Sequence, residues 1–119
     1  MYRVPSNLDL TEIIGQFTTQ ILVGQFDIQF SLGNVHFAIQ SSIKLVRNAE
    51  VIGTWREGVW PPPQFFELMN VEVDKYAIPN DRMIVIYLKN GIEIHLSDDW
   101  DQYESMQISL EGDPRQWII

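Results

Sequence analysis

Apolar and polar residues alternate along three neighbouring stretches in the first third of the chain. The stretches cover residues 17–23, 26–32 and 35–41, and Gly24-Gln25 and Gly33-Asn34 separate them. Successive side chains of a strand point to opposite faces, and glycine and asparagine favour the tight turns of hairpins. The pattern therefore predicts antiparallel strands that follow one another along the chain.

A similar layout returns in the second half of the chain. A weaker alternation over residues 71–78 precedes two clear strands over residues 84–88 and 92–97, which Asn90-Gly91 joins as a strong hairpin signal. Residues 28–39 align with residues 84–96 apart from one residue of turn length. We interpret this likeness as an internal duplication with pseudo-repeats at about residues 16–42 and 71–99. The alternative is that any two antiparallel hairpins resemble each other.

The insert between the two repeats, about residues 43–70, has a different character. Residues 43–46 and 51–55 read as two strands around a turn, and Pro61-Pro62-Pro63 then stiffens a loop that cannot join a sheet. Residues 64–69 follow as a short helix with a proline in its first turn.

A short helical turn or a strand lead-in is expected over residues 8–16, and further strands over residues 103–110 and 117–119. The pattern thus predicts a mainly β fold in a single domain, residues 1–119. We expect an antiparallel β-sandwich or half-open barrel of six to eight strands, built from two similar strand–hairpin units with one short helix.

Charge and composition restrict the partners of such a domain. The 119 residues carry 16 acidic and 8 basic side chains, a net charge of -8, and no cysteine. Phosphate backbones and anionic membrane surfaces repel an acidic protein, so we expect neither nucleic acid nor a membrane as a partner. Disulfides and thiolate ligands are excluded, no secretory leader is recognisable, and cytoplasmic residence is the expectation.

The acidic segment Asp98, Asp99, Trp100 and Asp101, with Glu104 nearby, is the first candidate site. Clustered carboxylates can bind a hard cation, but the spacing does not match a calcium-binding loop, and aspartate is a common turn residue. We therefore expect a solvated turn that could contact a protein rather than a metal site.

The two histidines, His36 and His95, form the second candidate. Both fall on the polar faces of their strands, and two histidines are too few for a zinc site. Neither has a serine, cysteine or carboxylate partner that the sequence would identify for triad chemistry. No recognisable catalytic or nucleotide-binding motif is present, so the sequence predicts no catalytic residue, metal ligand or cofactor.

Trp55, Trp60 and the proline run form the third candidate. Tryptophan is enriched at interaction hot spots, and a proline-stiffened loop can present it to a partner. The alternative is that Trp60 folds back over one end of the core.

The sequence LKNGIEIHLSDD at residues 88–99, followed by YESMQI at residues 103–108, resembles a family of small bacterial β-rich domains. In that family an Asn-Gly hairpin precedes a Tyr-Glu-Ser strand, and most members are uncharacterised. Some similar small acidic proteins are encoded beside toxins and act as immunity proteins. The resemblance covers about the last third of the chain, and it implies the β-rich fold and no catalytic residue.

These observations favour a non-catalytic protein-interaction module that is similar to an immunity protein. Its expected contact residues are Trp55, Trp60, Asp98, Asp99, Trp100 and Asp101. Two alternatives stay open. The first is a structural domain that assembles as a homodimer, because exposed sheet edges pair readily. The second, ranked lower, is an enzyme or a small-ligand binder.

Overall fold

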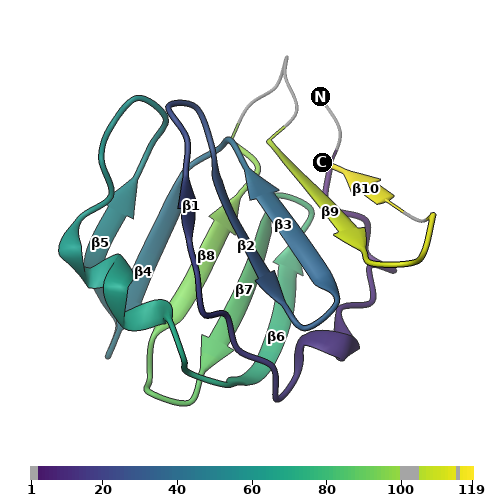
Figure 1. Cartoon of the computed structure of the whole chain (residues 1–119), viewed down its shortest axis with the longest axis horizontal. Coiled ribbons are helices and arrows are strands. Elements are labelled where there is room, and N and C mark those ends of the chain that lie inside the picture. The colour runs from purple at the N-terminus through teal and green to yellow at the C-terminus, as the bar shows by residue number, and fades with distance from the viewer. Residues whose placement is uncertain (1–2, 100–104, 115) are drawn as a thin grey trace.

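The protein is a sandwich of two antiparallel β-sheets (Figure 1). The computed structural model describes residues 3–99, 105–114 and 116–119. The described strands are β1 (Leu22–Val23), β2 (Ile28–Leu32), β3 (Val35–Ile39), β4 (Ile43–Arg47), β5 (Glu50–Trp55), β6 (Val73–Asn80), β7 (Met83–Leu88), β8 (Glu93–Ser97), β9 (Met106–Leu110) and β10 (Gln116–Ile118). The mainly β fold and the sandwich are confirmed, with more strands than the six to eight predicted.

Each sheet contains five of the described strands. Sheet A has the order β1-β2-β3-β9-β10, and sheet B has the order β5-β4-β8-β7-β6. The two hairpins that align in sequence, β2–β3 and β7–β8, therefore occupy different sheets. Each lies beside the strand that precedes it, β1 or β6.

The hairpin that follows each of these units joins the opposite sheet. The β4–β5 hairpin leaves β3 and pairs with β8, whereas the β9–β10 hairpin leaves β8 and pairs with β3. The strands β1 to β5 are thus related to the strands β6 to β10 by an exchange of hairpins between the sheets. Common ancestry of the two halves stays a prediction, but their topological equivalence is a property of the fold.

Matching hydrogen bonds mark the two crossing points. The N–H of Gln40 donates to the carbonyl of Ser105 at 2.8 Å, and the N–H of Ser97 donates to the carbonyl of Ser42 at 3.3 Å. Gln40 directly follows β3 and Ser97 is the last residue of β8, and each bonds to the residue before the incoming strand. A backbone N–H at the end of each hairpin thus finds its acceptor in the segment that crosses over from the other sheet.

The core lies between the facing sides of the two sheets. In β2 and β3 the burial alternates, so that Phe30 and Phe37 point inward and stack with ring centroids 5.0 Å apart. Ile84, Ile86 and Leu96 face them from sheet B and are fully buried. Burying these apolar rows is the main stabilising contribution to such a fold.

Two local features differ from the sequence-based expectation. The segment of residues 64–69 is a 3-10 helix, η2 (Pro63–Leu68), and residues 11–13 form a second one, η1 (Thr11–Ile13). Only Leu22–Val23 of the alternating stretch 17–23 pairs with β2, because Gln16 and Thr18 bond instead to Val73 and Asn70. In the described part of the chain, no helix has the length and apolar character needed to cross a membrane.

Candidate functional site

The loop after β5 and the 3-10 helix η2 that follows it carry the two most exposed large apolar side chains of the described chain, Trp60 and Phe66. The loop is tied to the β1–β2 turn, because the N–H of Gly58 donates to the carbonyl of Gln25 at 2.7 Å. Pro62 then packs against β5 at Gly53, where an added β-carbon would lie 3.2 Å from the Pro62 ring. The missing side chain at Gly53 thus lets the proline run lie close to the sheet.

The 3-10 helix η2 fixes which side chains of this region face solvent. Phe65 and Leu68 are buried, whereas Phe66 between them is 78% exposed. Trp60 is 79% exposed, Phe26 is 60% exposed and Val59 is 59% exposed. We call these four exposed side chains the Trp60 patch: Phe26, Val59, Trp60 and Phe66.

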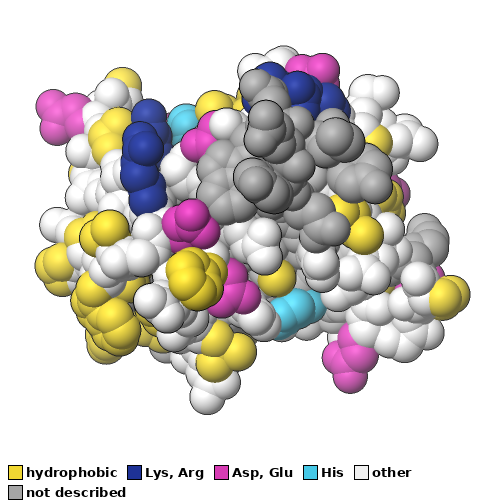
Figure 2. Space-filling model, turned by 90° about the horizontal axis from the view of Figure 1, so that it is seen from above, with side chains coloured by type: hydrophobic (Ala, Val, Ile, Leu, Met, Phe, Trp, Pro, Cys, Tyr) yellow, Lys and Arg dark blue, Asp and Glu magenta, His cyan; other side chains and the backbone are white. Residues whose placement is uncertain are grey.

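An apolar groove runs beside the Trp60 patch. It has a volume of about 190 Å³, and its lining includes Ile21, Val23, Trp60, Phe66 and the proline run. Figure 2 shows apolar side chains gathered along the left of the molecule, the side on which Figure 1 draws η2 and β5. A group of exposed apolar side chains, unlike a single one, marks an interaction surface. The groove adjoins β1, one of the two edge strands of sheet A as described.

Trp55 does not belong to this surface. Its side chain is 0% exposed, β5 pairs it with Ile43 of β4, and it lies in the core. Its prediction as a contact residue is therefore wrong. Its indole N–H is buried without a hydrogen-bond partner among the described residues.

The acidic segment is only partly exposed. Asp98 is 1% exposed; it accepts a hydrogen bond from the Ser105 hydroxyl at 2.6 Å and pairs with Arg3 at 3.4 Å. It thus secures the crossover after β8 and is not accessible to a partner, so its prediction as a contact residue is also wrong. Asp99 is exposed and accepts a hydrogen bond from Ser42 at 2.6 Å. Trp100 and Asp101 lie outside the described residues.

The two histidines lie on the outer faces of different sheets. His36 is on β3 and His95 on β8, and both alternate with buried core residues. Within the described ranges 3–99, 105–114 and 116–119, no group of three or more potential ligands could hold a metal ion.

Both histidines have hydrogen-bond partners that the sequence pattern did not reveal. The ring Nδ1 of His36 lies 2.8 Å from the hydroxyl of Ser31, and Nε2 of His95 lies 3.0 Å from Glu93. The sequence identified no such partner for triad chemistry, and the structure shows a serine beside one histidine and a carboxylate beside the other. Ser31 lies directly opposite His36 across the Gly33-Asn34 turn, and a register count from that turn would have found the pair. An imidazole beside a hydroxyl, as His36 lies beside Ser31, can exchange a proton with it. Acyl transfer would also require hydrogen-bond donors that stabilise an oxyanion.

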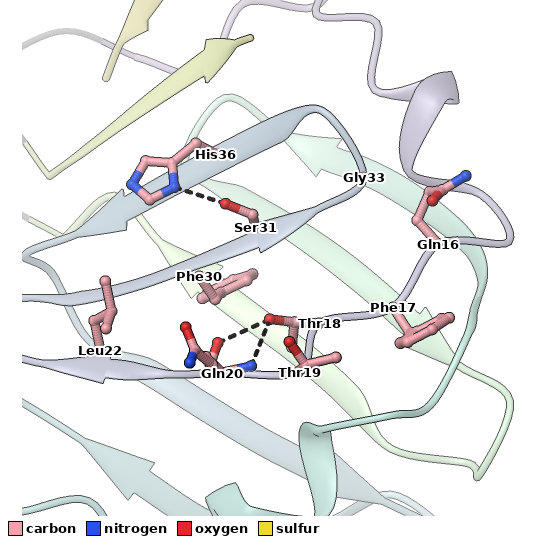
Figure 3. A pocket seen from close by; sticks show the side chains of 10 residues that line it. All are labelled: Gln16, Phe17, Thr18, Thr19, Gln20, Leu22, Phe30, Ser31, Gly33 and His36. Atoms are coloured by element: carbon pink, nitrogen blue, oxygen red, sulfur yellow. Dashed lines mark hydrogen bonds between the residues drawn. The ribbon is translucent and has the colours of Figure 1, made fainter.

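The outer face of sheet A is uncharged. The described strands β1, β2, β3, β9 and β10 contain no Asp, Glu, Lys or Arg, whereas the strands of sheet B include Lys44, Lys75 and Glu93. A pocket of about 330 Å³ opens between this face and the segment of residues 16–20 (Figure 3). Its polar lining consists of amide, hydroxyl and imidazole groups.

The described chain therefore offers two separate surfaces with the character of binding sites. One is the apolar Trp60 patch with its groove, and the other is the uncharged pocket next to Ser31 and His36. No protein-family model matches the chain, and neither the curated proteins nor the solved structures contain one with significant similarity to it.

Proposed function

We propose that the protein is a non-catalytic protein-interaction module that binds its partner through the Trp60 patch. The observation that carries the proposal is the exposure of Trp60 and Phe66, at 79% and 78%, beside an apolar groove. Large aromatic side chains that become buried at an interface dominate binding energies, and they are costly to leave in water. The adjoining edge strand β1 adds backbone groups to which an extended segment of a partner can pair.

Charge indicates the chemistry of the partner. Asp27 follows Phe26 and Glu57 precedes Val59 by two residues, in a chain with a net charge of -8. Glu67 follows Phe66 but is already paired with Arg47 at 3.4 Å. We therefore expect a partner that inserts an apolar side chain into the groove and places lysine or arginine around it. A basic toxin bound by an immunity-like protein has this chemistry, in line with the family resemblance of the last third of the chain.

A homodimer is the second candidate. The strands β1, β10, β5 and β6 are edges of the described sheets and could pair with a second copy. Two copies with a net charge of -8 repel each other, which favours a partner of opposite charge. Light scattering at several concentrations separates the two: a monomer supports the heteromeric module, and a stable dimer supports self-assembly.

We also propose that the protein resides in the cytoplasm, because a chain without cysteine gains nothing from an oxidising compartment.

The test is a binding measurement with matched variants. A partner recovered from the native host is purified, and its dissociation constant is measured calorimetrically against the wild type, Trp60→Ala, Phe66→Ala and Ile14→Ala. Trp60→Ala should raise the constant about 30-fold, the effect of a hot-spot residue. Ile14 is 45% exposed but lies next to η1, away from the patch, and its substitution should change the constant less than about twofold. Equal affinity of the wild type and both aromatic variants would contradict the proposal.

A further inference from the structure

We propose that the pocket beside the β2–β3 hairpin binds a small neutral polyhydroxylated molecule, such as a mono- or disaccharide. Figure 3 shows Ser31 and His36 of the hairpin on one side of the pocket and Thr18, Thr19 and Gln20 on the other. The volume of about 330 Å³ is near the lower end for ligand sites, which fits about one or two sugar rings.

A chain of hydrogen bonds fixes the hydroxyl of Ser31 at the pocket wall. The Gln29 amide donates from Nε2 to the Asp27 carboxylate at 2.7 Å, and its Oε1 lies 3.1 Å from Nε2 of His36. A carboxylate accepts only, so the Gln29 oxygen must face His36, and Nε2 of His36 must carry a proton. In the neutral ring Nδ1 is then an acceptor, and the Ser31 hydroxyl donates to it at 2.8 Å.

This arrangement gives Ser31 a defined role toward a ligand. Because its proton is held by His36, the Ser31 oxygen presents only its lone pairs to the pocket. It can therefore accept a hydrogen bond from a ligand hydroxyl without first rotating. A preorganised acceptor reduces the entropy lost on binding.

The remaining lining selects for a neutral ligand with several hydroxyl groups. Gln16, Thr19 and Gln20 are exposed and can both donate and accept hydrogen bonds. None of the lining residues is Asp, Glu, Lys or Arg, so a charged ligand would lose hydration without gaining a counter-charge. A purely apolar ligand would instead leave the amide and hydroxyl groups unpaired.

Aromatic surface completes the match to a sugar. Phe17 is 49% exposed at the pocket, and the largely buried Phe30 lies at its inner wall. Sugar rings combine an apolar C–H face with hydroxyl groups at the edge. They can therefore cover Phe17 while their hydroxyls bond to Ser31 and the glutamines.

An NMR titration with matched ligands tests the ligand class. Labelled protein is titrated with glucose, N-acetylglucosamine, maltose and inositol, and with the charged analogues glucosamine and glucuronate. Concentrations up to about 50 mM detect dissociation constants in the millimolar range. We expect saturable shifts with at least one neutral compound at residues 16–20 and 31–36, and weaker binding of the charged analogues. The absence of saturation for all neutral compounds, shifts elsewhere, or equal binding of the charged analogues would overturn the proposal.

Two serines that flank His36 provide the matched variants. Ser31 and Ser109 are both paired with His36 across sheet A, but only Ser31 lines the pocket. Ser31→Ala should raise the dissociation constant of the bound sugar about three- to tenfold, and Ser109→Ala less than about twofold. Equal effects of the two substitutions would overturn the role assigned to Ser31. Trp60→Ala should leave sugar binding unchanged, so the outcome does not depend on the interaction proposed for the Trp60 patch.

Discussion

The buried pair of Asp98 and Ser105 provides the sharpest test of how the crossovers stabilise the fold. Both side chains are nearly inaccessible, at 1% and 0% exposure, and the Ser105 hydroxyl donates to the Asp98 carboxylate at 2.6 Å. The backbone of Asp98 is held separately by Arg82, whose carbonyl accepts the Asp98 N–H at 2.8 Å. Substituting the two side chains therefore removes their mutual bond while the backbone contacts remain.

The magnitude follows from what each substitution leaves behind. Asp98→Ala removes the ion pair with Arg3 and the hydrogen bond from Ser105, and it leaves the Ser105 hydroxyl buried without its acceptor. We expect a loss of about 2–4 kcal/mol in the free energy of unfolding. Ser105→Ala leaves a buried carboxylate with one donor fewer, which costs about 1.5–3 kcal/mol. The double variant leaves neither the carboxylate nor the hydroxyl buried without its partner, and it loses the Arg3 ion pair just as Asp98→Ala does, so it should cost no more than the larger single loss. The coupling energy is then about 1.5–3 kcal/mol.

Urea unfolding of the wild type, both single variants and the double variant measures this cycle. Asp99→Ala is the control, because Asp99 is exposed and water can replace it toward Ser42; its cost should stay below about 1 kcal/mol. Strict additivity of the two single losses would refute the reasoning, since it would mean that the two side chains do not interact in the folded protein.

Three further predictions concern stability. Trp55→Ala should lower the free energy of unfolding by about 3–5 kcal/mol, and Trp60→Ala by less than about 0.5 kcal/mol, because one side chain is 0% and the other 79% exposed; similar losses in thermal melts would contradict the assignment. Ala49 has a φ of 65°, so Ala49→Gly should relieve left-handed strain and raise stability by up to about 1 kcal/mol; a decrease on urea unfolding would count against this. Fragments 1–70 and 71–119 should each be unfolded by circular dichroism and regain a β spectrum when mixed, because each supplies a hairpin to the sheet of the other; cooperative unfolding of either fragment alone would exclude that dependence.

Local signals in the sequence were sufficient to predict the hairpins. Alternation and the Gly33-Asn34 turn fix the pairing of Phe30 with Phe37, and Asn90-Gly91 does the same for Ile86 with Ile94. Both pairs depend only on residues close in sequence. The core positions of these strands follow from the same alternation.

The position of Trp55 could not be read in this way. Val51 and Trp55 share the same parity in β5, yet Val51 is 57% exposed and Trp55 is buried. The register between β4 and β5 shifts at Leu45 and Val46, where the irregularity moves the following residues to the other face. Such a bulge depends on the partner strand and leaves no clear trace in the alternation of one strand.

The exchange of hairpins between the sheets is also non-local. Residues 40–42 are compatible with a tight turn that would return β4 beside β3, but β4 instead pairs with β8. The pairing of Ser105 with Gln40 and of Ser42 with Ser97 depends on both crossovers at once. For the same reason the contact between Asp98 and Ser105 lay beyond the sequence pattern, which placed Asp98 in a solvated turn.

The two proposed binding surfaces differ in charge, so binding at each should depend differently on salt concentration. Sheet A has uncharged strands, and the pocket of about 330 Å³ on its outer side has no charged lining residue. Glu57 instead adjoins the Trp60 patch in sequence, and the net charge of the chain is -8. A basic partner is therefore attracted to the patch by a field that salt screens, and its association rate should fall steeply as ionic strength rises. Binding of a neutral sugar has no such long-range contribution, so its affinity should stay constant over the same range of salt. An association rate of the protein partner that does not change with ionic strength would contradict a basic partner at the Trp60 patch.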